Sequence, residues 1–343
     1  MQLKRFEGNP ILKPNPENQW ENLCVLNPGV IYDEQSKLFI MLYRAGGDEY
    51  EHYIRLGKAV SKDGFHFERT SDLPNFDVDP DDADGGCIED PRIVKIEDIY
   101  YITYASRPWY PGRYWIGPER YYKEYDQVEK SLATPKFIHT NYTVSYLAMT
   151  RDFEHYKRLG RITDSRIDDR DVSLFPENVN GTYVRISRPF IEQDENGNAL
   201  KMPSIWITFS DDLLEWEKGK VLITGKEWWE VHRMGGACPP IKTKRGWFLM
   251  YHGKDKDDVY RVGAMMLDLN DPTKVLARTR QFFMEPEFEY EKKGFINGVV
   301  FPCGNVVKDG TLYVYYGCAD QYIGVATADF ETLIDWIFAQ GKE

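Results

Sequence analysis

Residues 87–104 read CIEDPRIVKIEDIYYITY, in which an acid, a proline and an arginine lead directly into an alternating, aromatic-rich segment. Alternation with a period of two, together with enrichment in Ile and Tyr, predicts a pair of β-strands joined by a short turn. The acid–proline–arginine group before them is either a polar turn or the beginning of a strand inside an active site. Other parts of the chain help to decide, because the same pattern returns in them.

Five segments share this order of a proline, a short strand, a turn rich in Gly, Asp or Asn, and a second strand centred on aromatic residues. Their prolines recur about every 63 residues, except across one longer interval: Pro28, Pro91, Pro176, Pro240 and Pro302. After each segment come an apolar strand, a polar turn that usually contains Asp, and the beginning of another strand. Four strands repeated five times predict an all-β fold, a five-bladed β-propeller whose four-stranded antiparallel blades surround a central channel.

The spacing of the repeats also predicts the domain organisation. Residues 1–343 form a single propeller domain, because no low-complexity segment or linker interrupts the chain. The longer interval contains an aromatic-rich insertion at about 107–142, which we expect to cover the channel mouth or to contact a second copy of the chain. Residues 329–340, DFETLIDWIFAQ, predict a C-terminal helix.

Composition excludes several classes of protein. A formal net charge of −12 argues against a nucleic-acid or anionic-membrane partner, since those surfaces require a basic face. The N-terminus has no apolar signal-peptide core, and no apolar run approaches the ~20 residues that a membrane span needs. The five scattered cysteines predict reduced core thiols and a cytoplasmic location, and their spacing predicts no metal site.

In a propeller the repeats place equivalent residues at one end of the channel. Before each proline stand Asn27, Asp90, Phe175, Pro239 and Phe301, of which only Asp90 is acidic. At the ends of the second strands stand Arg44, Arg107, Arg188, His252 and Asp320, and nearby loops add Asp63, Arg170 and Arg233. The third and fourth repeats thus bring together four potential cations in an acidic protein, which predicts an anion site because arginine forks suit phosphate oxygens.

Each of these residues also has a simpler interpretation. An Asp before Pro is often a turn cap, and a single arginine is more often an ion-pair partner. His252 after a tyrosine-ended strand is more often a core histidine, with its ring hydrogen-bonded. Recurrence at equivalent places favours a shared site, since structural turns have no reason to gather arginines in two neighbouring blades.

Together these residues resemble glycoside hydrolase family 130, the β-mannoside phosphorylases, over essentially the whole chain outside the insertion. The matching motifs are NPG at Asn27, LYRAGG at Arg44, SKDG at Asp63, EDPR at Asp90, LFPENVNGTYVRISRP ending beyond Arg188, RMGGACPPI at Arg233, MYHG at His252 and YYGCAD at Asp320. The resemblance implies a five-bladed propeller with Asp90 as its single catalytic acid. It also implies that phosphate is bound by Arg170, Arg188, Arg233 and His252, although lysine is usual at the place of Arg233.

The resemblance further implies that the non-reducing mannose is held by Asn27, Arg44, Asp63 and Asp320, with Tyr104 near the acceptor sugar. The expected reaction is phosphorolysis with inversion, giving α-mannose 1-phosphate and a shortened acceptor, with phosphate as co-substrate and no cofactor. A short β-1,2-mannoside is favoured slightly over a β-1,4-mannoside. The insertion leaves homo-oligomerisation open.

Two other functions remain open at this point. A hydrolase on the same fold would need a base to activate water, for which Glu89 and Asp171 are the candidates. A non-catalytic, sugar-binding propeller would not need a lone acid facing arginines. Phosphorolysis needs no base, because phosphate is already an anionic nucleophile, and it needs cations to hold that anion.

Overall fold

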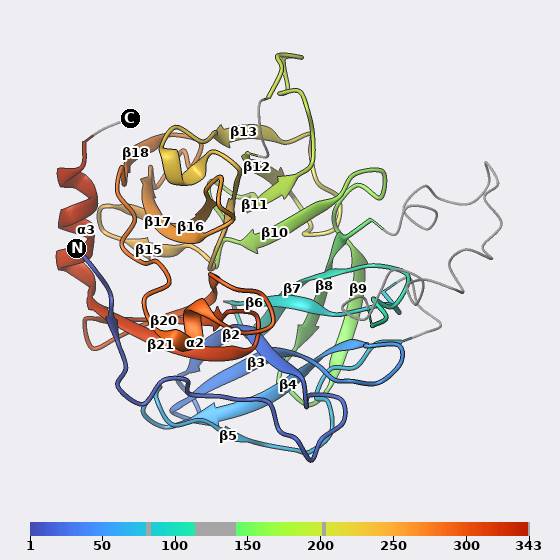
Figure 1. The fold of residues 1–343 in the computed structure, drawn as a ribbon. Coiled ribbons are helices and arrows are strands. Elements are labelled where there is room, and N and C mark those ends of the chain that lie inside the picture. Colours follow the sequence, from blue (N-terminus) through green and yellow to red (C-terminus); the bar gives the residue numbers. More distant parts are fainter. Residues whose placement is uncertain (80–83, 114–141, 201–203, 342–343) are drawn as a thin grey trace.

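The computed structural model describes residues 1–79, 84–113, 142–200 and 204–341, and its strands form five sheets arranged around a ring (Figure 1). The first blade contains β2 (Cys24–Asp33), β3 (Leu38–Gly46), β4 (Ile54–Ser61) and β5 (Glu68–Arg69). The second contains β6 (Glu89–Ile96), β7 (Ile99–Ser106), β8 (Val144–Thr150) and β9 (Tyr156–Arg161). The third contains β10 (Asp169–Leu174), β11 (Tyr183–Pro189), β12 (Ile205–Ser210) and β13 (Lys220–Ile223). The predicted five-bladed β-propeller is confirmed.

The innermost strand of the fourth blade is divided in two. Its parts are β14 (Arg233–Gly236) and β15 (Ile241–Thr243), which both pair with β16 (Gly246–Lys254). The blade continues outward through β17 (Tyr260–Leu267) and β18 (Val275–Arg278). Pro240 therefore lies between two strand segments, and the arginine-bearing β14 precedes it.

The N-terminal strand completes the fifth blade. This blade contains β19 (Val300–Lys308), β20 (Thr311–Cys318) and β21 (Tyr322–Asp329), and its outermost strand is β1 (Lys4–Arg5). The two residues of β1 pair antiparallel with Thr327 and Ala326 of β21. The repeat pattern did not predict this strand, because two residues are too few to show an alternation of apolar and polar side chains.

The aromatic-rich pattern of the opening stretch is explained by burial of both faces of a blade. Tyr100, Ile102 and Tyr104 of β7 pack towards the first blade in one apolar cluster. Tyr101, on the opposite face of β7, packs against a different cluster shared with the third blade. A strand covered by neighbours on both sides buries apolar side chains at successive positions, which is why the blade strands are rich in aromatic and β-branched residues.

The innermost strands approach one another closely around the axis. β2 contacts β6 and β19, and β10 contacts β6 and β14. At Gly304 of β19, a Cβ would lie 2.5 Å from the backbone nitrogen of Val30 and 2.7 Å from the carbonyl oxygen of Pro28. The first and fifth blades can therefore meet at this distance only because glycine has no side chain.

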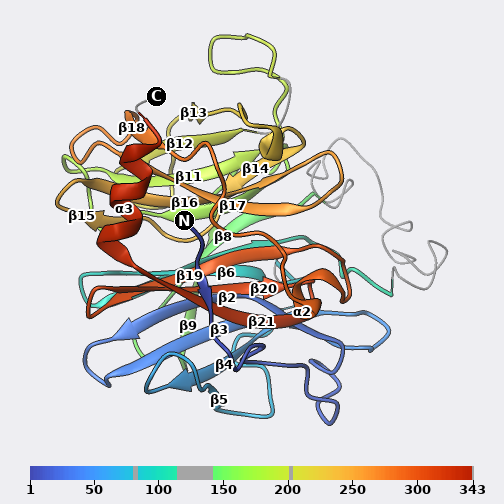
Figure 2. The same cartoon turned by 60° about the vertical axis from the view of Figure 1, so that its left-hand side comes forward.

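Helices are few, as expected, and the predicted C-terminal helix is present as α3 (Phe330–Ala339). Figure 2 shows α3 on the outside of the ring, where Phe330, Leu333 and Ile337 join the core cluster of the fourth and fifth blades. Asp329 caps its N-terminus by accepting a hydrogen bond from the Thr332 backbone. Short helical segments in the described residues include η3 (Trp228–Glu230) and α2 (Glu289–Lys292).

Three further features bear on the sequence predictions. All five cysteines are buried and free, as expected for core thiols. No helix in the described part of the chain is long and apolar enough to cross a membrane. Residues 114–141 of the insertion lie outside the described residues, so its role as a lid or an oligomer contact stays a prediction.

Candidate active site

Three blades carry an equivalent bulge in their innermost strand. In β2, Leu26 pairs with Arg44 and Gly29 with Leu42, so two residues face one on β3. β6 and β10 have the same irregularity, between Glu89 and Arg92 and between Arg170 and Ser173. A bulge redirects the side chain of its first residue and often lies beside an active site.

The first bulge residue is left-handed in each case: Asn27 at φ 45°, Asp90 at φ 53° and Asp171 at φ 57°. Asn and Asp adopt this conformation more readily than other non-glycine residues. The prediction that Phe175 is the third-blade equivalent of Asp90 is therefore wrong, because the bulge places Asp171 there. Phe175 is buried instead, with its ring centroid 4.9 Å from that of Trp247.

Asp90 meets residues of the first blade at the axis. Its Oδ1 accepts hydrogen bonds from Asn27 Nδ2 at 2.8 Å and from Arg44 Nη1 at 2.9 Å. The same Arg44 nitrogen lies 3.5 Å from Glu89 Oε2. The structure thus brings together three residues that the sequence assigned to one sugar-binding and catalytic centre.

Asp320 belongs to the same group of charges. It follows β20 of the fifth blade, and burial raises the pKa of its carboxyl to about 6. Arg44 opposes that rise in pKa, whereas Asp90 and Glu89 add to it. Asp320 is therefore a carboxyl that titrates near neutral pH beside the Asp90 centre.

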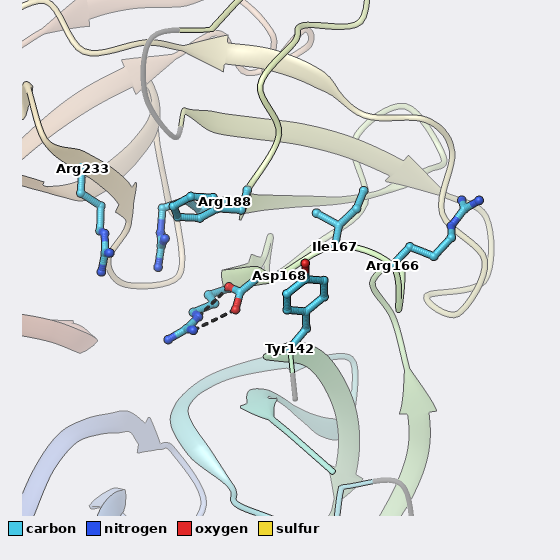
Figure 3. A pocket seen from close by; sticks show the side chains of 8 residues that line it. Tyr142, Arg166, Ile167, Asp168, Arg188 and Arg233 are labelled. Carbon is cyan, nitrogen blue, oxygen red and sulfur yellow. Dashed lines mark hydrogen bonds and ion pairs between the residues drawn. The ribbon is translucent and has the colours of Figure 1, made fainter. Parts of the chain in front are cut away.

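A cavity of about 420 Å³ opens beside this centre, on the side of the third and fourth blades. It is lined by Tyr142, Arg166, Ile167, Asp168, Arg170, Arg188, Phe190 and Arg233. Figure 3 shows Arg188 and Arg233 pointing in the same direction from their two blades. Four arginines and one aspartate line this cavity, so it attracts anions although the whole protein is acidic.

The arginines of the cavity differ in their partners. Arg170 makes a two-pronged pair with Asp168, through Nε at 2.7 Å and Nη2 at 2.9 Å (dashed lines in Figure 3). Arg188 is buried and donates from Nε to Asp171 Oδ2 at 2.5 Å. Arg233 donates from Nη1 to the Tyr260 hydroxyl at 3.4 Å, a long and weak contact.

His252 lies behind these arginines and does not line the cavity. Its Nε2 is 3.7 Å from Asp171 Oδ2, and its ring centroid is 4.6 Å from that of Phe301. Burial lowers the pKa of His252 to about 3, even though Asp171 opposes the shift. The sequence counted His252 as a potential cation, but at neutral pH its imidazole is uncharged and can act only as a hydrogen-bonding group.

Arg92 is a residue that the sequence analysis missed. It is buried, and its guanidinium donates to the Asp90 carbonyl at 3.1 Å and to Asp171 Oδ1 at 3.3 Å. It also donates to the backbone of the fourth blade, at Ala237 and Gly236. Arg92 therefore links the acid centre to the arginine side of the channel, and the EDPR motif already contained it.

The approach of β14 to this cluster depends on a glycine. A Cβ on Gly235 would lie 2.1 Å from Asp171 Oδ2, 2.6 Å from His252 Cε1 and 3.0 Å from Arg188 Nε. Any side chain would therefore displace the groups that hold Arg188. This close approach explains why a glycine follows Met234 in the RMGG motif.

One predicted sugar-binding residue lies elsewhere. Asp63 is in the turn after β4, where its Oδ1 accepts from the backbone of Phe65 and His66. Ser61 pairs with Phe39 at the opposite end of β3 from Arg44, roughly 17 Å away at ~3.3 Å per residue. Asp63 thus shapes a turn far from the axis.

Tyr104, predicted to lie near the acceptor sugar, is a buried and hydrogen-bonded residue of β7, and its contact with substrate stays a prediction. It is 1% exposed, and its hydroxyl donates to Asp84 Oδ2 at 2.6 Å. Burial and that carboxylate raise the pKa of Tyr104 well above its usual value. The side chain packs in the cluster between the first and second blades, and the bulge of β6 places Asp90 and Pro91 opposite Tyr104 on β7.

The two candidate bases are both buried and paired. Burial alone would raise the pKa of Glu89, but Arg44, Arg107 and Arg170 hold it at about 2. Burial likewise opposes ionisation of Asp171, but the charges of Arg188 and Arg92 hold its pKa well below the usual range. A base works best when its pKa lies near the working pH, so neither carboxylate is suited to activating water.

Comparisons with known proteins agree with this geometry. The family described as β-1,4-mannooligosaccharide phosphorylase matches residues 2–339. A 1,2-β-oligomannan phosphorylase of Thermoanaerobacter sp. strain X514 is 41% identical over 97% of this chain and 99% of its own. A β-1,2-mannobiose phosphorylase of the same organism is 34% identical over 96% of this chain and 98% of its own.

Among solved structures, the β-1,2-mannobiose phosphorylase of Listeria innocua in complex with β-1,2-mannobiose superposes with a TM-score of 0.79. It is 25% identical, and the match covers 99% of this chain and 100% of the other. The bulged inner strands, the carboxylate at the axis and the arginine-lined cavity thus occur in a chain that matches one family along nearly its whole length. The chain belongs to glycoside hydrolase family 130.

Proposed function

We propose that this protein is an inverting β-mannoside phosphorylase, a hexosyltransferase that transfers a mannosyl unit to inorganic phosphate. The observation that carries the proposal is the cavity lined by Arg170, Arg188 and Arg233 beside the axial carboxylate Asp90. Three guanidinium groups can bind a phosphate anion and offset its repulsion as it approaches the reacting carbon. Phosphate is the only further reactant in this proposal, and no metal or organic cofactor takes part.

The reaction forms one bond and breaks one. A phosphate oxygen bonds to the anomeric carbon of the non-reducing mannosyl unit, while the bond from that carbon to the glycosidic oxygen breaks. The departing oxygen takes up a proton that originates at Asp90 and passes through a sugar hydroxyl. Hydrogen phosphate loses its proton as the ester forms, and that proton, exchanged through water, restores Asp90. The products are α-mannose 1-phosphate and an acceptor shortened by one unit.

The surrounding residues position the reactants. Asn27 and Arg44 hold Oδ1 of Asp90, which fixes the orientation of the carboxyl group. In this proposal Asp320 of the fifth blade, which interacts electrostatically with Arg44 and Asp90, hydrogen-bonds the mannosyl unit. Arg188 is oriented by Asp171, whose Oδ2 also lies 3.7 Å from Nε2 of the neutral His252. Arg92 connects the two sides of the reaction centre through Asp90 and Asp171.

Hydrolysis is the main alternative, and the state of the carboxylates argues against it. An inverting hydrolase needs a second carboxyl as base. Glu89 and Asp171, the two candidates, are ion-paired, and their pKa values are lowered. Their ion pairs suit them to positioning arginines.

The relatives favour a β-1,2-linked substrate. Those named for β-1,2-linked mannosides are 41% and 34% identical to this chain, although the family description names β-1,4-mannooligosaccharides. We therefore propose a β-1,2-mannobiose or β-1,2-mannooligosaccharide as substrate. Buried, free cysteines fit a reducing compartment, so we propose a cytoplasmic location. Assembly into a homo-oligomer stays a prediction.

The test is incubation with a panel of β-1,2- and β-1,4-mannosides, with and without inorganic phosphate, followed by assay of mannose 1-phosphate and free mannose. Mannose 1-phosphate that forms only with phosphate, and chiefly from β-1,2-linked substrates, is the expected result. Free mannose formed equally without phosphate would identify a hydrolase. The absence of both products would favour a non-catalytic sugar-binding propeller.

A further inference from the structure

A second and larger cavity, of about 710 Å³, lies beside the phosphate cavity on the third blade. It is bounded by the connection from β9 to β10, by one face of β11 and β12, and by the turn before β13. Arg166 and Ile167 line both cavities and separate them. The Proposed function assigns no role to this second cavity, which we call the side cavity.

The face of the third blade towards the side cavity is polar. In the pairing of β11 with β12, Ser187 lies opposite Trp206, and Arg185 lies opposite Thr208. All four line the side cavity. The alternating residues on the other face, Ile186 and Ile207, pack in the apolar core shared with the fourth blade. Elsewhere in this ring both faces of a blade pack against neighbours, so a polar face beside a cavity has a specific purpose.

Three buried polar atoms in this wall lack partners. They are Asp169 Oδ1, Arg185 Nε and Trp206 Nε1, none of which has a hydrogen-bond partner among the residues that the structure describes. Their residues are 6%, 6% and 5% exposed. A buried polar group without a partner costs about 1–3 kcal/mol. Three such groups in one wall leave hydrogen-bonding capacity unused beside the side cavity.

The charges of the side cavity indicate the kind of ligand. Asp169 and Arg185 are close enough to shift each other's pKa, yet no ion pair joins them among the described residues. Instead, the Arg185 guanidinium lies 4.4 Å from the ring centroid of Trp216 and donates to the Ile162 carbonyl. The whole lining carries five acidic and four basic residues, so its charges nearly balance, and the buried Asp169 and Arg185 are held apart. This balance suits a neutral ligand that can both donate and accept hydrogen bonds.

The aromatic residues narrow the ligand further. Trp206 and Trp216 both line the side cavity, together with the hydroxyls of Ser187 and Thr208. Indole rings offer apolar surface, and the hydroxyls and charged groups bind alcohol groups. A sugar has both kinds of surface, whereas a phosphate would meet the Asp169 carboxylate and an apolar ligand would leave the charges unsatisfied.

We infer that the side cavity binds mannosyl units of a β-mannooligosaccharide at a distance from the bond that is cleaved. This inference rests on the proposed function, because it takes the substrate class from it. The shared wall of Arg166 and Ile167 places the two cavities side by side. The units bound there belong either to the far end of the chain being cleaved or to a second chain.

The first test is binding without phosphate and therefore without turnover. β-1,2-mannotetraose is titrated into the Asp90→Asn protein, and into Asp90→Asn carrying Trp216→Ala or Thr208→Val, by calorimetry and tryptophan fluorescence. Loss of one aromatic or hydrogen-bonding contact is expected to weaken binding about fivefold. Trp228→Ala is the matched control, because Trp228 is 59% exposed and packs on Phe282, outside the side cavity.

The second test separates the two sources of the ligand. Trp216→Ala and Thr208→Val are also made with Asp90 intact. If they raise the KM for β-1,2-mannotetraose and leave the kinetics on β-1,2-mannobiose unchanged, the side cavity binds the far end of the chain being cleaved. If the variants bind one β-1,2-mannotetraose molecule instead of two and the KM is unchanged, the side cavity binds a second oligosaccharide chain. The inference would be overturned if Trp216→Ala and Thr208→Val changed neither the affinity and stoichiometry measured in the Asp90→Asn protein nor the KM measured with Asp90 intact. Because binding is measured without phosphate, sugar binding in the side cavity can be tested even if the protein does not catalyse phosphorolysis.

Discussion

At the scale of single residues, Asp90 is defined by what holds it. Its left-handed backbone at φ 53° directs the carboxyl towards the axis, and Asn27 and Arg44 both donate to the same oxygen. The proposed proton transfer depends on an acid at this place, which an amide cannot supply. Arg44, by contrast, would keep its contact with Glu89 after the acid is removed.

Asp90→Asn is expected to lower kcat by about 10²–10⁴-fold, the usual contribution of a general acid. The amide keeps the size of the side chain, so the melting temperature should change little. Phosphorolysis of β-1,2-mannobiose and thermal unfolding are measured on the same preparation. An active Asp90→Asn protein would rule out this residue as the acid.

Arg188→Ala is expected to raise the KM for phosphate about tenfold or more, because a charged hydrogen bond contributes about 1.5–3 kcal/mol. The KM for the mannoside should change much less, since Arg188 lies on the cavity side and the sugar lies at the axis. Initial rates over a matrix of both substrates separate the two effects. An unchanged phosphate dependence would contradict the assignment.

Asp320 should make stability depend on pH. Burial raises the pKa of its carboxyl in the folded state to about 6, above its ordinary value of 3.8. The folded state then holds a proton that the unfolded state has lost, so stability declines as pH rises from about 4 to about 6. Asp320→Asn removes this decline and should raise the melting temperature at pH 8 but not at pH 4. A melting-temperature difference that is the same at both pH values would contradict this origin.

At the scale of elements, the sequence predicted the strands but not their bulges. The period of two and the turns revealed each hairpin, because these signals are local. A bulge depends on pairing with the next strand, and its register is invisible in one segment. For this reason Phe175 was chosen instead of Asp171, and Pro91 was expected at the beginning of a strand although it lies within β6.

The same limit applies to the site residues. Asn27, Arg44, Asp90 and Asp320 were placed together from equivalent positions in the repeat, and the structure brings them together. Asp63 is predicted from a loop near the ends of the strands and from the SKDG motif, and Tyr104 from the resemblance alone. The turn that contains Asp63 and the core that buries Tyr104 cannot be recognised from composition. The neutral state of His252 depends on burial, which no sequence motif reports.

Gly235→Ala tests the close approach of β14. The added Cβ would lie 2.1 Å from Asp171 Oδ2, so the Asp171–Arg188 contact must shift. We expect a several-fold rise in the KM for phosphate together with a loss of stability. Gly236→Ala is the control, because its Cβ would meet chiefly the Ile186 side chain at 2.4 Å. Stability should fall in both variants, but the KM for phosphate should rise only in Gly235→Ala.

At the scale of the whole molecule, the ring is closed by residues from opposite ends of the chain. Arg5 of β1 forms a buried ion pair with Glu291, with Nε and Oε1 3.0 Å apart and side chains 4% and 0% exposed. It also donates to the Glu285 carbonyl at 2.6 Å. Closure therefore relies on a charged contact as well as on two residues of strand pairing.

Arg5→Ala is expected to lower the free energy of unfolding by about 3 kcal/mol, because it leaves Glu291 buried without its cation. Lys4→Ala is the matched control in the same strand, where the side chain is exposed and the change should be within about 0.5 kcal/mol. Chemical denaturation of both variants measures the difference. Equal stabilities would show that backbone pairing alone closes the ring.

This closure has a consequence for how the protein is made. Strand β1 is synthesised long before its partner β21, from which it is separated by more than three hundred residues of sequence. At ~5–20 residues per second, the first strand waits roughly 15–60 seconds for that partner to be synthesised. Until β21 has been made, β1 has no strand to pair with, so nascent molecules are exposed to mispairing with one another during that time.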